Sequence, residues 1–248
     1  MTSKKYLIVN ADDFGQSSGV NRGIIEAHEH GIVTSASLMV RWPAAAEAAL
    51  YSRNHPSLSL GIHIDLGEWQ YRGENWQPLY EIVNTDDRAA VATEVANQLA
   101  LFERLTGTAP THIDSHQHVH LREPVDAVLL DVSRELHIPL RHLSSTAHYC
   151  GEFYGQTAEG LPLPHQISLE HLIDLLSKLP SGLTELGCHP GYASDLNTTY
   201  RNERASEVEI LCDPRVRAAI TTSQIELCSF ISDSARQPRQ LTPADGSP

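Results

Sequence analysis

The chain has 248 residues, of which 41% are hydrophobic, and its formal net charge at pH 7 is −13. This length fits one large α/β domain or two small ones, and the apolar content is sufficient for a buried core. An acidic surface repels nucleic-acid phosphates and anionic lipids, so we expect neither kind of partner. Because no apolar signal segment or membrane span of ~20 residues is found, we expect a cytoplasmic protein.

The first half of the chain alternates apolar runs with segments of helical periodicity. Strands are predicted over residues 6–11, 32–40, 58–64 and 111–115, and helices over about 18–30, 43–52 and 87–106. Residues 67–85 are polar and aromatic and too long for an ordinary connection, so we predict a functional loop there.

The second half continues this alternation. Helices are predicted over 122–136, 169–179 and within 202–220, strands over 138–143, 183–188 and 224–231, and a long loop over 144–165. Such alternation predicts one domain, residues 1–231, with about seven parallel strands and covering helices. At this length a closed or nearly closed TIM-like barrel is favoured, and an open parallel sheet is the alternative. Residues 232–248 contain three prolines and few apolar residues, and we expect this tail to be disordered.

Acids and histidines follow the ends of four predicted strands. Asp12 and Asp13 come first, followed by His63, His116 and His189. Because catalytic groups of a parallel barrel sit where its strands end, these side chains are predicted to meet at one rim. One carboxylate and two imidazoles form a site for a divalent metal, and a second carboxylate is left over as a base. The pattern is therefore typical of a metal-dependent hydrolase.

Asp12 and Asp13 are adjacent, and neighbouring residues at a strand end are expected to point in different directions. One of the two can bind the metal while the other faces a water molecule. The alternative for this pair is a helix cap or a turn, where Asp is also favoured.

Residues 111–120 contain four histidines and form the densest signal in the chain. His116 lies nearest the strand end, and we select it as the metal ligand. Asp114 is a candidate for orienting an imidazole, as ligating histidines require. His118 and His120 are expected to line the cleft or support the loop.

His189 precedes Pro190 and Gly191 and is predicted to act as a general acid, since a histidine titrates near neutrality. Arg141 is predicted either to hold Asp12 in its anionic form or to make a plain surface ion pair. We add Glu185 and Trp69 as further candidates for contact with the substrate or the site. The cysteines lack Cys-x-x-Cys spacing and are expected to be reduced and structural.

Four ordered motifs resemble the YdjC/ChbG family of carbohydrate deacetylases. The matching segments are Asn10–Gly15, Gly61–His63, Thr111–His120 and Glu185–Gly191. The resemblance implies an irregular (β/α) barrel that removes acetyl groups from N-acetylated sugars such as chito-oligosaccharides. It implies that Asp13, His63 and His116 bind a metal, usually Mg²⁺, with Asp12 as base and His189 as acid. It also raises the prospect of a homodimer.

The predicted function is thus metal-dependent deacetylation of an acetylated carbohydrate. Two nitrogen ligands favour Zn²⁺, Mn²⁺ or Co²⁺ over Mg²⁺, so the ligand chemistry and the resemblance point to different ions. Two alternatives stay open: hydrolysis of another bond, such as a phosphoester or a cyclic amide, and a sugar-binding barrel that has lost catalysis.

Overall fold

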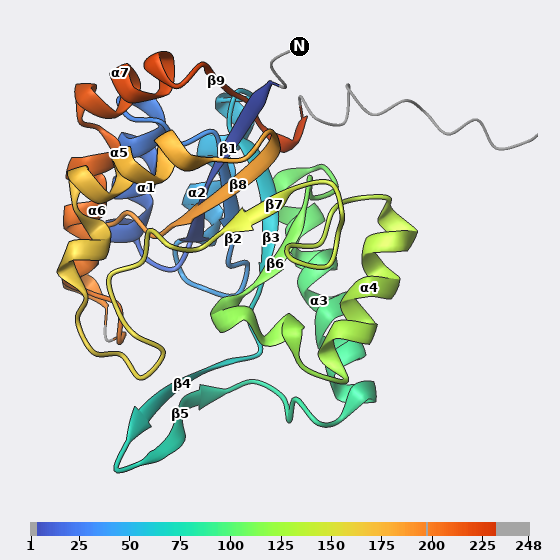
Figure 1. Cartoon of the computed structure of the whole chain (residues 1–248). Coiled ribbons are helices and arrows are strands. Elements are labelled where there is room, and N and C mark those ends of the chain that lie inside the picture. The colour runs from blue at the N-terminus through green and yellow to red at the C-terminus, as the bar shows by residue number, and fades with distance from the viewer. Residues whose placement is uncertain (1–3, 197, 232–248) are drawn as a thin grey trace, which may run out of the picture.

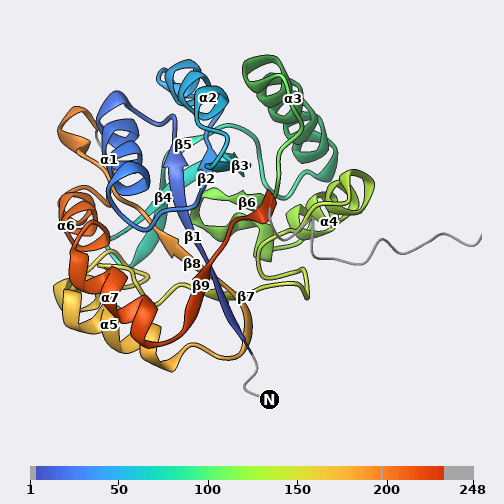
Figure 2. The same ribbon diagram turned by 90° about the horizontal axis from the view of Figure 1, so that it is seen from above.

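The computed structural model describes residues 4–196 and 198–231. A curled sheet of parallel strands forms its centre, and helices surround this sheet (Figures 1 and 2). The sheet contains β1 (Lys5–Phe14), β2 (Ser35–Leu38), β3 (Ser59–Ile64), β6 (Ile113–Ser115), β7 (His148–Cys150), β8 (Gly182–Cys188) and β9 (Ile225–Leu227). The strand order is β6-β3-β2-β1-β8-β7, and β9 also pairs with β1. The predicted α/β fold with about seven parallel strands is confirmed.

Within these described ranges, seven α-helices cover the sheet. They are α1 (Ser18–Glu29), α2 (Ala45–Asn54), α3 (Arg88–Thr106), α4 (Val125–Leu136), α5 (Leu169–Lys178), α6 (Glu203–Leu211) and α7 (Pro214–Thr222). Their ends follow the capping residues in the sequence. The side chain of Ser17 accepts a hydrogen bond from Val20 N at the start of α1, and Asp87 does the same for the first turn of α3. Gly107, at a φ of 77°, ends α3 in the left-handed conformation that favours glycine.

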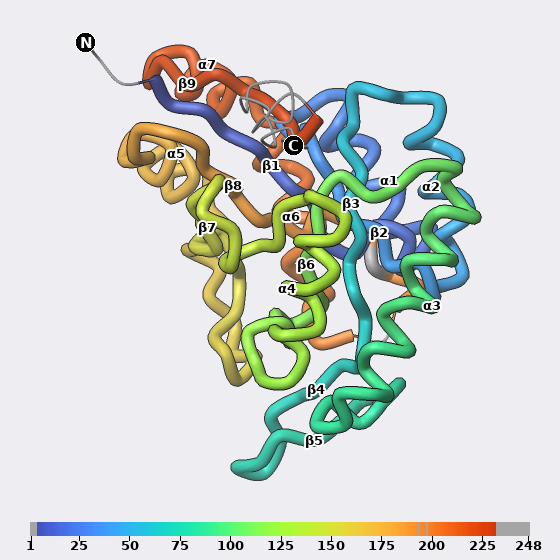
Figure 3. Tube along the Cα trace, turned by 90° about the vertical axis from the view of Figure 1, so that its right-hand side faces the viewer, coloured from blue at the N-terminus to red at the C-terminus, as the bar shows by residue number. Residues whose placement is uncertain are grey.

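The predicted loop at 67–85 is wrong, because most of it forms an antiparallel hairpin. Its strands are β4 (Gly67–Arg72) and β5 (Asn75–Glu81). The two residues between them, Gly73 and Glu74, have φ angles of 57° and 66°. Two positive φ angles in a two-residue connection match the twist of a hairpin. The hairpin follows the carboxyl end of β3 and projects away from the body of the molecule (Figures 1 and 3).

Two further predictions in the second half need correction. The strand expected over 138–143 is reduced to one bridge between Ile113 and Leu140, because His142 adopts a φ of 63° and turns the chain away. The loop expected over 144–165 contains β7, which pairs with β8. The other predicted elements are present, with shifted ends. For example, the first strand continues to Phe14 and the last is shortened to Ile225–Leu227.

The predicted tail, 232–248, lies outside the described residues, and the domain boundary at residue 231 stays a prediction. Among the residues that the structure describes, no helix combines the length and the apolar composition that crossing a bilayer requires. Cys150, Cys188 and Cys212 have free thiols.

Candidate active site

Asp12 and Asp13 lie in a bulge of β1. Ala11 pairs with Ala36 of β2 and Phe14 pairs with Leu38, so β1 has one extra residue over this stretch. The extra residue is accommodated at Asp13, whose backbone adopts a φ of 67°. A bulge of this kind redirects side chains that a regular strand would send to opposite faces. Both carboxylates line the same cavity, but they contact different side chains: Asp12 contacts Arg141, and Asp13 contacts Arg204.

Asp12 is held by the buried guanidinium of Arg141. Arg141 Nη1 lies 2.6 Å from Asp12 Oδ2, and Nη2 lies 2.8 Å from Oδ1. The same guanidinium contacts Asp114 at 2.7 Å and Glu185 at 2.8 Å. Burial raises the pKa of Asp12, but the charge and hydrogen bonds of Arg141, together with the charge of His63, hold it below its usual value. The alternative of a plain surface ion pair for Arg141 is wrong, since only 4% of this residue is exposed.

Asp13 is the centre of a second buried cluster. Its Oδ1 lies 3.3 Å from His63 Nε2 and 3.1 Å from His116 Nδ1, while Oδ2 accepts a hydrogen bond from Arg204 Nη2 at 2.6 Å. Burial raises the pKa of Asp13, but Arg204 and the two imidazoles lower it well below its usual value. Asp13 is therefore an anion facing two imidazoles.

On each imidazole, the ring nitrogen that does not face Asp13 lies close to a second carboxylate. Asp114 lies 2.7 Å from His63 Nδ1, so the other nitrogen of His63 is directed at Asp13. Glu68, at the base of β4, lies 3.6 Å from His116 Nε2 and accepts a hydrogen bond from Thr198 Oγ1. Burial lowers the pKa of His63, but the carboxylates of Asp114, Asp13 and Asp12 together raise it to about 9. The structure thus places Asp114 where an orienting partner of His63 should lie.

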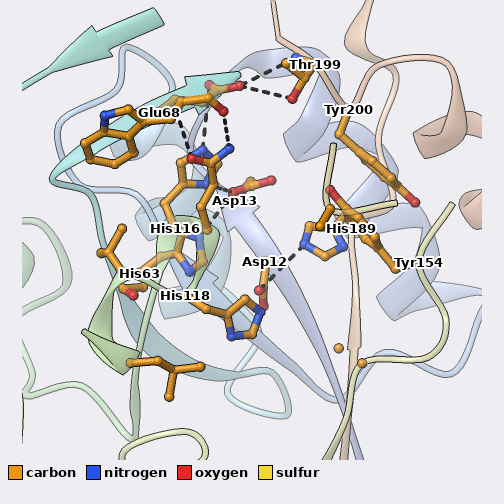
Figure 4. Close-up of a pocket in the computed structure, with 18 of the residues that line it drawn as sticks. Asp12, Asp13, His63, Glu68, His116, His118, Tyr154, His189, Thr199 and Tyr200 are labelled. Atoms are coloured by element: carbon orange, nitrogen blue, oxygen red, sulfur yellow. Dashed lines mark hydrogen bonds and ion pairs between the residues drawn. The ribbon is translucent and has the colours of Figure 1, made fainter. Parts of the chain in front are cut away.

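His189 lies on the other side of the two aspartates (Figure 4), with its Nε2 3.7 Å from Asp12 Oδ2. Its backbone N–H donates to Glu207 of α6, and the rings of Tyr154 and Tyr200 flank it with centroids 5.2 and 5.3 Å away. Burial lowers the pKa of His189 to about 4. Within the described residues its Nδ1 is buried without a hydrogen-bond partner.

A glycine contact positions the turn that carries His189. A Cβ on Gly23 of α1 would lie 2.4 Å from Gly191 Cα, so the helix and the turn touch through their backbones. Only glycine permits this approach, and it fixes the turn against α1.

One cavity of about 530 Å³, within the range of ~300–1,000 Å³ for small-molecule sites, is lined by Asp12, Asp13, His63, Glu68, His116 and His189. His118 and Trp69 line it as well. His118 has a φ of 53° and packs against Tyr149 and two other histidines, His120 and His142. His120 itself is buried, with its Nδ1 2.6 Å from Ser115 Oγ, and supports the loop.

The donor set of Asp13, His63 and His116 fits a divalent metal. One ligand atom from each lies within 4.8 Å of the others. Two atoms bound to one ion at ~2.0–2.2 Å lie at most about 4.4 Å apart, and both Asp13 distances meet this condition. Asp12, His63 and Asp114 form a second group of this kind. Both of its carboxylates already contact the guanidinium of Arg141, so a further cation is less favoured there.

Sequence reasoning missed several residues of this cavity: Glu68, Tyr149, Tyr154, Thr198, Tyr200 and Arg204. Arg204 and Glu68 carry the clearest contacts, with Asp13 and His116 respectively. Neither stands next to a recognisable motif, and an arginine on a helix is ordinarily exposed. A charged residue on α6 that reaches β1 is visible only in three dimensions.

Comparison with known proteins gives consistent matches along the chain. The model of the family described as YdjC-like protein matches residues 6–222. A carbohydrate deacetylase of Geobacillus stearothermophilus is 34% identical over 91% of this chain and 97% of its own length. A chitooligosaccharide deacetylase of Serratia marcescens is 32% identical over 92% of this chain and 98% of its own.

Solved structures with a similar fold were also found. A protein of Enterococcus faecalis V583, named as a candidate for cellobiose-phosphate cleavage, superimposes with a TM-score of 0.77 at 28% identity, over 93% of this chain and 99% of its own. A family 4 carbohydrate esterase of Streptomyces lividans has a TM-score of 0.54 at 13% identity, over 92% and 93% of the two chains, and shares the fold. On the evidence of the family match and of relatives above 30% identity, the chain belongs to the YdjC-like protein family.

Proposed function

We propose that the protein is a hydrolase that removes acetyl groups from N-acetylated sugars. The observation that carries this proposal is the placement of Asp12 and His189 on one cavity with Asp13, His63 and His116. Binding alone requires no carboxylate base and no imidazole beside a metal-binding group. The relatives named carbohydrate and chitooligosaccharide deacetylases supply the substrate class.

In this proposal Asp13, His63 and His116 hold one divalent ion, and their nitrogen donors favour Zn²⁺, Mn²⁺ or Co²⁺ over Mg²⁺. The ion would supply a Lewis acid that polarises the amide carbonyl and stabilises negative charge in the transition state. Arg204, on the far oxygen of Asp13, keeps that carboxylate ionised. Asp114 fixes the ring orientation of His63.

Asp12 would act as the base. Arg141 holds it as an anion with a lowered pKa, so it is unprotonated at neutral pH and able to accept a proton from water. His189 would deliver a proton to the departing amine. It is neutral in the resting site because burial lowers its pKa to about 4, so it must first gain a proton. That proton would be the one that Asp12 takes from water, because Asp12 Oδ2 lies 3.7 Å from His189 Nε2, and its transfer would return Asp12 to the ionised form.

Acetate release from a panel of N-acetylated sugars, measured on the metal-loaded protein, tests the proposal. Asp12→Asn should abolish turnover, leave the fold intact and keep metal binding. Full activity of Asp12→Asn would refute the base assignment. Phosphate release from phosphorylated sugars without acetate release would favour the phosphoester alternative. Sugar binding without any turnover would favour a barrel that has lost catalysis.

A further inference from the structure

The β4–β5 hairpin has one aromatic face and one polar face. Trp69 pairs with Pro78, and Tyr71 pairs with Trp76. Because side chains alternate along a strand, these four residues share a face, and we call it the aromatic face of the hairpin. The other face carries Gln70, Arg72, Asn75 and Gln77. Trp76 is 51% exposed and Tyr71 38% exposed, so the outer part of the aromatic face meets solvent.

The aromatic face is continuous with the candidate active site. Trp69 and Trp76 line the same cavity as Asp12 and His189. Tyr71 extends the face beyond this cavity, with its ring centroid 5.6 Å from that of Trp76. A molecule bound at the catalytic groups could therefore continue along the hairpin.

Two contacts fix the hairpin relative to the site. The side-chain amide of Gln117 accepts a hydrogen bond from Trp69 N and donates one to Trp69 O, both at 2.8 Å. Gln117 follows His116 directly and has a φ of 51°, a strained value that this pair of bonds helps to hold. Glu68 binds Thr198 on the opposite wall. The aromatic face is thus a fixed extension of the cavity rather than a free arm.

We propose that the aromatic face of the hairpin binds further sugar units of an oligosaccharide whose acetylated unit lies at Asp12 and His189. This inference rests on the proposed function and adds a preference for oligosaccharides over single sugars. The C–H groups on one face of a pyranose ring form an apolar surface with partial positive charge, which complements the electron-rich face of an indole. A second copy of the chain is a less favoured partner for the aromatic face, because two copies that each have a net charge of −13 repel each other.

The test compares acetate release from N-acetylglucosamine and from its oligomers of two to four units. Wild type should show kcat/KM rising with oligomer length. Trp76→Ala should lower kcat/KM for the tetramer about tenfold, the value of one aromatic contact, and leave the single sugar unchanged. Gln77→Ala is the matched control, since Gln77 is exposed on the polar face of the same strand, and it should behave as wild type.

Calorimetry of the tetramer with Asp12→Asn, alone and combined with Trp76→Ala, gives a readout that is independent of turnover. Loss of affinity with Trp76→Ala supports the inference even if no sugar is deacetylated, in which case the proposed function alone fails. Equal kinetics on single sugars and oligomers in wild type would overturn the inference. An unchanged tetramer rate in Trp76→Ala would do so as well, as would a wild-type dimer that this substitution converts to monomer in sedimentation.

Discussion

Replacing Arg141 by methionine should destabilise the fold more than any other single change at this site. The guanidinium is buried and contacts three carboxylates, those of Asp12, Asp114 and Glu185. Methionine has a similar length but no charge, so the carboxylates lose their shared partner. Removing one member of a buried ion pair costs about 3–5 kcal/mol, and we expect a loss of unfolding free energy at the upper end of this range. That is a large part of the ~5–15 kcal/mol of a typical domain.

The loss should depend on pH in a defined direction. In wild type the pKa of Asp114 is lowered: burial raises it, but Arg141 and His63 together outweigh burial. Burial is the largest single effect on both carboxyls, so without Arg141 we expect it to dominate and to raise the folded-state pKa values of Asp12 and Asp114 above those of the unfolded chain. Carboxyls with raised folded pKa values destabilise the fold as pH increases. The difference in stability between Arg141→Met and wild type should therefore be smallest near about pH 4 and largest near about pH 8.

Urea unfolding followed by circular dichroism at several pH values measures this effect. Arg134→Met is the matched control, because Arg134 is exposed and forms an ion pair with Asp131 on the surface of α4. The control should change the unfolding free energy by less than about 1 kcal/mol. Adding Asp12→Asn to Arg141→Met removes one unpaired charge and should restore part of the loss. An Arg141→Met protein as stable as wild type at pH 8, or a loss that does not change with pH, would refute the reasoning.

Two further predictions concern metal binding. Asp114→Asn removes the carboxylate that orients His63 and should weaken metal affinity about 10–100-fold in calorimetry, whereas unchanged affinity would contradict the orienting role. Metal binding should also release protons at neutral pH. Although burial lowers the pKa of His63, the carboxylates of Asp114, Asp13 and Asp12 together raise it to about 9, and a ligand must be neutral. The affinity for the metal should therefore rise with pH up to about 9. A metal affinity that does not change with pH would show that His63 carries no proton in the metal-free site.

The sequence allowed the sheet and the gathering of acids and histidines at its rim to be predicted. Buried parallel strands are continuous apolar runs, and Asp12, His63 and His189 each stand where such a run ends. That relation is local, so it can be read from one chain. The alternation of strand and helix then fixed the parallel arrangement, because a crossover helix returns each strand to the same direction.

Other parts of the site depend on contacts that no local pattern contains. The bulge at Asp13 arises from pairing with β2, and an aspartate carries little sign of a φ of 67°. Arg204 reaches Asp13 from a helix that follows almost two hundred residues later. The hairpin has a clearer signal in the sequence, since Gly73 marks its turn and aromatic and polar residues alternate through Trp69–Arg72. Pairing of the two strands with each other depends on their register, which the length and composition of 67–85 alone do not specify.

The most direct test of the account is the position of a bound metal. A crystal grown with Mn²⁺ and measured at the manganese absorption edge should show one anomalous peak within bonding distance of Asp13 Oδ1, His63 Nε2 and His116 Nδ1. These are the atoms that the structure brings together. An active, metal-dependent enzyme whose peak lay elsewhere, or outside the reach of any one of these three side chains, would contradict the account.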